Sequence, residues 1–134
     1  MILEPLVGEL QESWARDDPT IAHRWYWPVY ADKGTENTST VYFEIDPGKR
    51  IGAHTHDADE TVVVLAGHAR GRVGDEAGEV SEGMVVHAPA EVTHDFENTG
   101  RETLKLIGFF SKAQVKSTYE AVLMPDETTS SGTP

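Results

Sequence analysis

Residues 48–67, GKRIGAHTHDADETVVVLAG, contain the pattern that decides the fold expected for this chain. His54, His56 and Glu60 stand at even separations, and side chains two or four residues apart on a strand point to the same face. His94 must then reach the same point from another strand. Three imidazoles and a carboxylate are ligands suited to a divalent first-row metal. The spacing therefore predicts one metal site built on flat, antiparallel strands.

These ligands lie within two longer motifs, each of which begins with a glycine. The motifs are Gly48-x5-His54-x-His56-x3-Glu60-x6-Gly67 and Gly83-x5-Pro89-x4-His94-x3-Asn98. Almost position for position, they resemble the two conserved motifs of the cupin superfamily, and they cover about half of the chain. The resemblance implies an all-β fold, a cupin-type double-stranded β-helix or jelly-roll barrel with a short N-terminal arm. It also implies that the metal ligands are His54, His56, Glu60 and His94.

One position departs from the cupin pattern. Between Pro89 and His94 the cupin motif usually carries a glycine, whereas this chain has Glu91. Glycine tolerates a positive φ that is costly for glutamate, so the loop before His94 is expected to differ in shape.

The inference of a metal site depends on the joint spacing of the four residues, because none of them alone would indicate one. A lone histidine in a strand is usually a surface residue or a hydrogen-bonded polar residue. The alternative to an enzyme is a cupin barrel that keeps the ligands and is used only for binding. His68 and His87 lack comparable spacing, and we interpret them as structural or surface residues. His23 is a candidate pocket residue that no spacing supports.

The length of 134 residues suits a single domain with one core. We expect an N-terminal arm and first strand over residues 1–36 and the barrel over residues 37–125. Residues 126–134 are polar and poor in apolar side chains, and we expect them to form a disordered tail.

Turn residues divide the chain into short segments. Residues 1–21 are expected to form a short helix or an arm packed on the barrel. Residues 23–30 are expected to form a strand in which Pro28 marks an edge or a bulge, because proline cannot donate a hydrogen bond to a neighbouring strand. Further strands are expected near residues 40–46, 52–57, 60–65, 68–74, 84–88, 93–98 and 103–110.

The charge and composition exclude several classes of partner. The formal net charge is -12, from 11 Lys and Arg against 23 Asp and Glu, and cysteine is absent. A polyanion repels nucleic acid and anionic lipid, whose binding depends on Lys and Arg. No apolar run approaches the roughly 20 residues of a membrane span. We therefore expect a cytoplasmic protein without nucleic-acid or membrane partners, and the acidity also fits a high-salt cytoplasm.

The strand that follows Gly67 suggests where a substrate pocket lies. Ala69 and Gly71 alternate with larger cationic residues and are expected to face inward, beside the metal. The predicted pocket residues are therefore Ala69, Gly71, Phe96 and Phe109. The alternative is that the two small residues only accommodate bulky neighbours such as Phe96 or Phe109.

Four protein ligands on a six-coordinate metal leave two neighbouring positions open for a small-molecule substrate. The cupin resemblance implies dioxygenase, isomerase, cyclase or lyase activity without selecting one of them. We expect a metal-dependent enzyme, with a mononuclear non-haem dioxygenase that uses Fe(II) as the leading class and Mn, Ni, Zn or Cu as other metals. The alternatives are a redox-neutral isomerase, cyclase or lyase, and a non-catalytic small-molecule-binding cupin.

An aromatic cluster near the N-terminus indicates an interface. Trp25, Tyr26, Trp27 and Tyr30 form too much apolar surface for a small barrel to expose, since large contiguous apolar patches are rare on monomers. The cluster predicts a homodimer with this segment at or near the interface. The alternative is that the N-terminal arm covers these aromatic residues within one chain.

Overall fold

Alternation of inward and outward side chains builds this molecule almost entirely from β-strands. The computed structural model describes residues 1–134, with one short 3-10 helix, η1 (Ala31–Lys33). The strands are β1 (Gln11–Ala15), β2 (Ala22–Val29), β3 (Ser39–Ile45), β4 (His54–His56), β5 (Glu60–Ala66), β6 (His68–Val73), β7 (Glu76–Ser81), β8 (Val85–Ala88), β9 (His94–Asn98), β10 (Leu104–Phe110), β11 (Lys116–Met124) and β12 (Thr128–Gly132).

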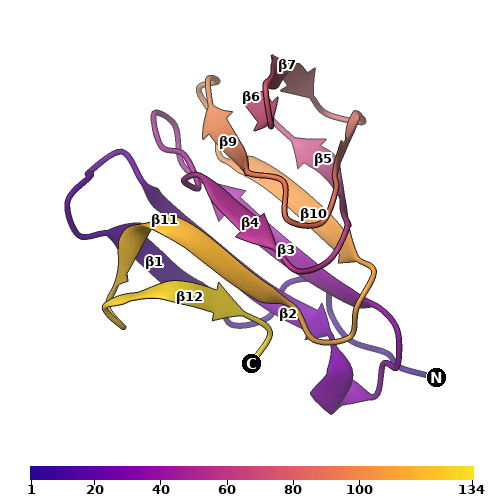
Figure 1. Cartoon of the computed structure of the whole chain (residues 1–134). Coiled ribbons are helices and arrows are strands. Elements are labelled where there is room, and N and C mark those ends of the chain that lie inside the picture. Colours follow the sequence, from indigo (N-terminus) through magenta and orange to yellow (C-terminus); the bar gives the residue numbers. More distant parts are fainter.

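The strands form one sheet that curls on itself. Their order is β7-β6-β9-β4-β11-β1-β2-β3-β10-β5-β8, and β12 pairs with β11 outside this path. The two ends of the sheet approach each other, because β5 contacts β7 and β6 contacts β8. The curled sheet is visible in Figure 1, where β4, β9 and β11 lie opposite β3 and β10. This nearly closed antiparallel barrel confirms the all-β cupin fold.

The core lies between the two walls of the barrel. In β10, Leu104 and Leu106 are fully buried, and they pack with Val62 and Val64 of β5 and with Phe43 of β3 in one hydrophobic cluster. Burial of each side chain of this size contributes roughly 1.5–3 kcal/mol. The two walls therefore hold together without disulfides.

The strands expected between residues 40 and 110 are present, with ends shifted by about two residues or less. Pro28 lies where the pairing of β2 with β3 changes register between Tyr26 and Val29, in agreement with the expected bulge. β7 was not predicted, because four of its six residues are exposed and it contains two glutamates and a glycine, which are depleted in strands.

The N-terminal residues form an arm and a strand instead of a helix. Residues 1–10 have no regular structure, and β1 then pairs with both β2 and β11. Glu4 lies 3.8 Å from Lys33, and Gly8 packs on the ring of Tyr26 so closely that no β-carbon would fit. The arm therefore covers part of the aromatic cluster within one chain.

The C-terminal residues differ from the expected disordered tail. β11 and β12 are antiparallel, and Ser117 lies opposite Ser131. The polar composition of residues 126–134 argued against a strand, but strand pairing uses backbone groups and does not require apolar side chains. The free edge of β11 supplies those partners, so β12 joins the sheet.

Candidate metal centre

The structure brings the four predicted ligands together inside the barrel. His54 and His56 lie on β4, Glu60 begins β5, and His94 begins β9. The pairing of β4 with β9 places His54 opposite His94. The ligand nitrogens of the three histidines lie within 4.8 Å of one another, and all four side chains are buried. This group could hold one metal ion.

Outer hydrogen bonds fix how the three imidazoles are presented. Nδ1 of His54 lies 2.7 Å from the carbonyl oxygen of Gly52, and Nδ1 of His94 lies 3.0 Å from that of Val92. A carbonyl oxygen only accepts hydrogen bonds, so Nδ1 carries the proton in both rings. In its neutral form, each ring would therefore turn the lone pair of Nε2 toward the centre, as metal-binding histidines do.

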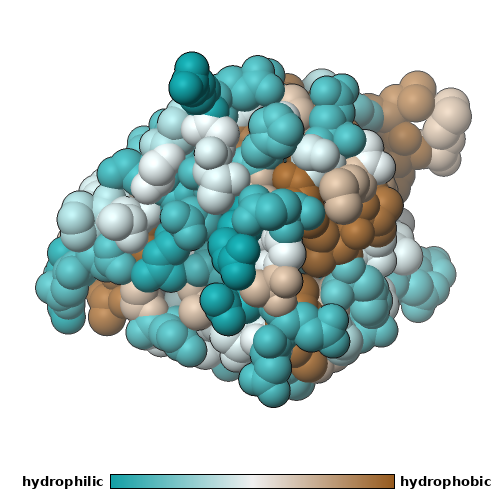
Figure 2. Space-filling view, turned by 90° about the horizontal axis from the view of Figure 1, so that it is seen from above, coloured by the Kyte–Doolittle hydropathy of each residue, from teal (hydrophilic) through white to brown (hydrophobic).

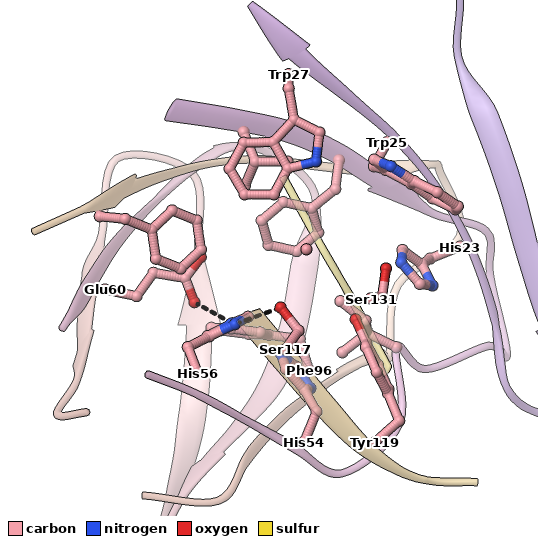
Figure 3. Close-up of a pocket in the computed structure, with 15 residues that line it drawn as sticks. His23, Trp25, Trp27, His54, His56, Glu60, Phe96, Ser117, Tyr119 and Ser131 are labelled. Atoms are coloured by element: carbon pink, nitrogen blue, oxygen red, sulfur yellow. Dashed lines mark hydrogen bonds and ion pairs between the residues drawn. The ribbon is translucent and has the colours of Figure 1, made fainter. Parts of the chain in front are cut away.

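His56 is oriented by a side chain from a distant strand. Its Nδ1 lies 2.7 Å from the hydroxyl oxygen of Ser117 on β11, a contact drawn in Figure 3. β11 pairs with β4 in a register that sets Ser117 opposite His56. The Ser117 hydroxyl thus fixes the orientation of the His56 imidazole through Nδ1 and leaves Nε2 to face the centre.

The position of Glu60 tests whether these residues fit a metal. Its Oε1 lies 3.2 Å from Nε2 of His94 and 3.3 Å from Nε2 of His56. In neutral His94 that nitrogen has a lone pair and no proton, and it faces a carboxylate oxygen that also has only lone pairs. A cation between the two, either a proton or a metal ion, removes this repulsion. The donor set therefore fits a divalent metal.

The electrostatics favour the protonation states that a metal requires. Burial, followed by the neighbouring His94 and His56, lowers the pKa of His54 well below its ordinary value. Burial raises the pKa of Glu60, but hydrogen bonds and positive charge from the facing imidazoles, when these are protonated, lower it more, so that its pKa is lowered overall. A neutral imidazole and an ionised carboxylate are the forms that bind metal.

Gly108 on β10 makes room for the Glu60 carboxylate. A β-carbon at position 108 would collide with the carboxylate oxygen Oε2 of Glu60. β10 and β5 are paired, so the missing side chain lets the carboxylate lie against the backbone of its neighbour. The motif spacing gave no indication of this requirement, because Gly108 lies outside both motifs.

A cavity with mainly aromatic walls adjoins the ligands. It has a volume of about 40 Å³ and contains His54, His56 and Glu60 in its lining. Six of its other lining residues are aromatic: Trp25, Trp27, Phe43, Phe96, Phe110 and Tyr119. Figure 3 shows Trp25, Trp27 and His23 on the side of the cavity away from His56. Ser131 and Gly132 also line it, so β12 forms part of the wall.

Of the predicted pocket residues, Phe96 lines this cavity and the other three do not. Phe109 is 46% exposed, because Gly108 and Phe110 occupy the inward positions of β10 and neighbouring residues of a strand face opposite ways. A β-carbon at Gly71 would lie 3.6 Å from the ring of Phe96. Gly71 and fully buried Ala69 thus accommodate bulky neighbours, which was the alternative interpretation.

His23, the candidate pocket residue that no sequence spacing supported, lines the cavity. The ring is buried, and its Nδ1 has no hydrogen-bond partner. Burial lowers the pKa of His23 to about 4, so the imidazole is neutral at pH 7. The ring stacks near Tyr119 at 6.1 Å, and Tyr119 stacks on His54 at 4.6 Å, both measured between ring centroids. By contrast, His68 and His87 are exposed, as expected.

Glu91 keeps the backbone conformation for which cupins usually use glycine. Its φ is 64°, and its N–H donates to the carbonyl oxygen of His56 at 2.8 Å. The expected change of loop shape is therefore not needed at this residue. A non-glycine residue in this region costs about 1–2 kcal/mol, which the loop before His94 bears.

The structure contains no helix with the length and apolar character needed to cross a membrane. Its single helical segment has three residues.

Comparisons with known proteins agree with this geometry. An uncharacterized protein of Streptomyces coelicolor is 33% identical over 73 residues, which are 54% of this chain and 70% of that protein. A structure provisionally described as a sugar phosphate isomerase, from Acidithiobacillus ferrooxidans, has a TM-score of 0.59 and 24% identity, covering 76% of this chain and 67% of its own.

A second solved structure is the oxalate decarboxylase of Bacillus subtilis, which has Mn(II) centres. It has a TM-score of 0.67 and 17% identity, and the match covers 80% of this chain but only 30% of the decarboxylase. These likenesses concern the fold alone. The family model of the cupin domain matches residues 41–110, which contain both motifs and all four converging ligands. The chain therefore belongs to the cupin domain family.

Proposed function

We propose that this chain is a metal-dependent cupin enzyme that acts on a small organic molecule, and that it is a mononuclear non-haem dioxygenase. One observation carries the proposal: the buried ligands His54, His56, Glu60 and His94 converge beside a cavity with mainly aromatic walls. When bound as Fe(II), the metal supplies redox chemistry toward dioxygen and the substrate.

The residues around the metal centre and those of the cavity wall have separate roles in this function. Gly52, Val92 and Ser117 hold the imidazoles in their ligating orientation. The indole and phenyl rings offer flat apolar walls, and a substrate bound against them would displace water from the metal centre. Exclusion of water from a reactive centre suppresses competing hydrolysis.

The same cavity is less suited to a redox-neutral isomerase, cyclase or lyase. Such reactions move protons and work best with an acid or base whose pKa lies near the working pH. His23 has a pKa of about 4 and is a weak base at pH 7. Burial raises the pKa of Tyr119, so its hydroxyl stays protonated. Glu60 is occupied as a ligand.

A non-catalytic binding protein is the second candidate, and the size of the cavity favours it. The volume of about 40 Å³ is well below the roughly 150 Å³ that accommodates benzene in an engineered cavity. A protein that only binds a metal ion with a small ligand needs no larger space.

Metal analysis with oxygen uptake separates these candidates. The full chain should be purified without an affinity tag and its metal content measured. We expect iron, and oxygen consumption that depends on both iron and an added organic substrate. Zinc or nickel in the purified protein, with turnover that consumes no oxygen, would favour the redox-neutral class. Ligand-dependent shifts of Tm without any turnover would favour the binding protein.

We also propose a cytoplasmic homodimer that pairs near the aromatic cluster Trp25, Tyr26, Trp27 and Tyr30. Trp25 and Trp27 line the internal cavity and the arm packs on Tyr26, so the partly buried Tyr30 remains for a partner. Analytical ultracentrifugation at micromolar concentration tests the dimer. A monomer would favour coverage by the arm alone.

A further inference from the structure

We propose that the cavity selects a small organic monoanion that carries one uncharged hydrogen-bonding group at the end remote from the metal, and that His23 binds this group. The inference deepens the proposed function and rests on its metal centre. Two independent features of the cavity support it: the charges of its lining and the unpartnered imidazole of His23.

The lining sets the charge of the ligand. Glu60 is the only acidic residue among those that line the cavity, and none of them is Lys or Arg. A divalent metal with one carboxylate has a net charge of about +1, which one negative charge on a ligand neutralises. A second anionic group would lie against aromatic rings without a cation, and burying an unpaired charge is strongly unfavourable.

The nearby arginines do not supply that missing cation. Arg24 is bound by Glu44 and Asp46, and Arg50 is bound by Asp18 and Asp95. Neither arginine lines the cavity. The cavity therefore discriminates against phosphate esters and dicarboxylates.

His23 supplies the second feature. It is 7% exposed, it lines the cavity, and its Nδ1 has no partner in the protein. Buried polar groups nearly always have a hydrogen-bond partner, so an unpartnered one in a binding cavity indicates a partner from the ligand. A neutral imidazole has one donor and one acceptor and can bind either a hydroxyl or a carbonyl.

The arrangement of rings places His23 away from the metal but within reach of the same ligand. Tyr119 lies between His23 and His54, with centroid separations of 6.1 Å and 4.6 Å. Figure 3 shows His23 beside Trp25, on the side of the cavity opposite Glu60. The cavity is only partly enclosed, so a ligand of a few carbon atoms can bind the metal by one end and His23 by the other while part of it extends beyond the enclosed volume of about 40 Å³.

Three four-carbon anions test the proposal on the Co(II)-loaded full chain. Butyrate has no remote polar group, 4-hydroxybutyrate has a remote hydroxyl, and succinate has a second carboxylate. Co(II) binding is measured first, and the change of its visible absorption then reports each anion. We expect 4-hydroxybutyrate to bind about fivefold more tightly than butyrate. We expect succinate to bind at least about tenfold more weakly than butyrate.

Variants at His23 assign the preference to this residue. His23→Phe should abolish the preference for 4-hydroxybutyrate and leave the affinity for butyrate within about twofold. His23→Gln, whose amide also donates and accepts, should restore part of it. His68→Phe, the same change at an exposed histidine, should keep the wild-type preference. A merely structural role of His23 would change the affinities for butyrate and 4-hydroxybutyrate equally.

Other outcomes overturn the inference. Succinate that binds as tightly as butyrate contradicts the charge selection, and a preference that survives in His23→Phe contradicts the role of His23. A metal-loaded chain that binds none of the three anions contradicts both. A chain that fails to bind Co(II) overturns the inference together with the metal centre. If the selectivity is found without oxygen consumption on any substrate, the inference stands and only the proposed dioxygenase fails.

Discussion

Four buried histidines lie in the metal centre and its adjoining cavity, and they differ in what binds their Nδ1 atoms. His54, His56 and His94 each have a protein partner for Nδ1 at 2.7–3.0 Å. His23 has none. The partnered rings are held in one orientation, which a metal site requires, whereas the unpartnered ring keeps its hydrogen-bonding capacity free. The difference indicates that one side of the cavity is organised before any ligand binds and the other side is completed by the ligand.

Removal of a partnered ring should have the largest effect. His56→Ala should lower metal affinity by more than about 100-fold, beyond the roughly 10–100-fold that loss of an outer partner costs. Isothermal titration with Zn(II) measures the affinity, and circular dichroism checks that the β fold is retained. Full metal retention in a folded His56→Ala protein would contradict the assignment of this ligand.

Lowering the pH should reduce the stability of the folded protein, because the buried ring of His23 resists protonation. The pKa of His23 is about 4 in the folded protein, against about 6.5 when unfolded. The unfolded chain therefore takes up the proton first, so the contribution is complete above about pH 6.5 and is lost as the pH falls toward 4. At about 1.4 kcal/mol per pKa unit, the loss is up to about 3 kcal/mol.

Urea unfolding between pH 7 and 4 tests this expectation by comparing wild type with His23→Phe. The wild type should lose up to about 3 kcal/mol more than the variant over this range. His54 titrates in the same direction in both proteins, and His23 is the smallest of the causes of its pKa shift, so the difference reports mainly on His23. Parallel pH profiles of the two proteins would show that His23 does not titrate as a buried group.

Space beside the Glu60 carboxylate should also matter, although less than a ligand itself. Gly108→Ala should push the Glu60 carboxylate away and lower metal affinity by roughly 10–100-fold, as perturbing a ligand does. Gly78→Ala is the matched control, because a β-carbon there meets nothing within 4 Å. Equal metal affinity in the two variants would show that Glu60 does not need this space.

Loss of one outer partner should have a moderate effect. Ser117→Ala removes the hydroxyl that holds His56 and should lower metal affinity by about tenfold. Ser131→Ala changes the same type of residue in the cavity wall without touching a ligand and should leave the affinity unchanged. If both variants bind metal like the wild type, the partner of His56 is not needed for its orientation.

The smallest effect is expected at the loop before His94. Glu91→Gly removes the cost of φ 64° but adds backbone entropy to the unfolded chain, so the net gain should be about 0.5–1 kcal/mol. Thermal unfolding of the metal-free protein measures it, with a rise in Tm as the expected result. A lower Tm would show that Glu91 makes stabilising contacts that outweigh its backbone strain.

Much of the site could be predicted from the sequence because the information is local. His54, His56 and Glu60 lie within seven residues, and strand parity alone sets their common direction. His94 could be added because the second motif has its own characteristic spacing. The motifs also indicated the barrel, whose central strands lie close to the expected residues.

The opposite side of the cavity could not be predicted in this way. His23 and Trp25 come from β2, Ser117 and Tyr119 from β11, and Ser131 from β12. In β11, Ser117 and Tyr119 are buried between exposed neighbours, which is the alternation expected of a half-buried strand. No local pattern, however, states which strand β11 will pair with.

The sequence by itself determined which residues converge as candidate metal ligands and which fold family the chain adopts, because the spacing within a strand fixes the direction of each side chain. Only the tertiary structure decided which residues form the cavity, which strand the C-terminal residues join, and that Gly108 gives room to Glu60. These features depend on pairing between strands that are far apart in the chain. The register of such pairing is set by the packing of the whole barrel.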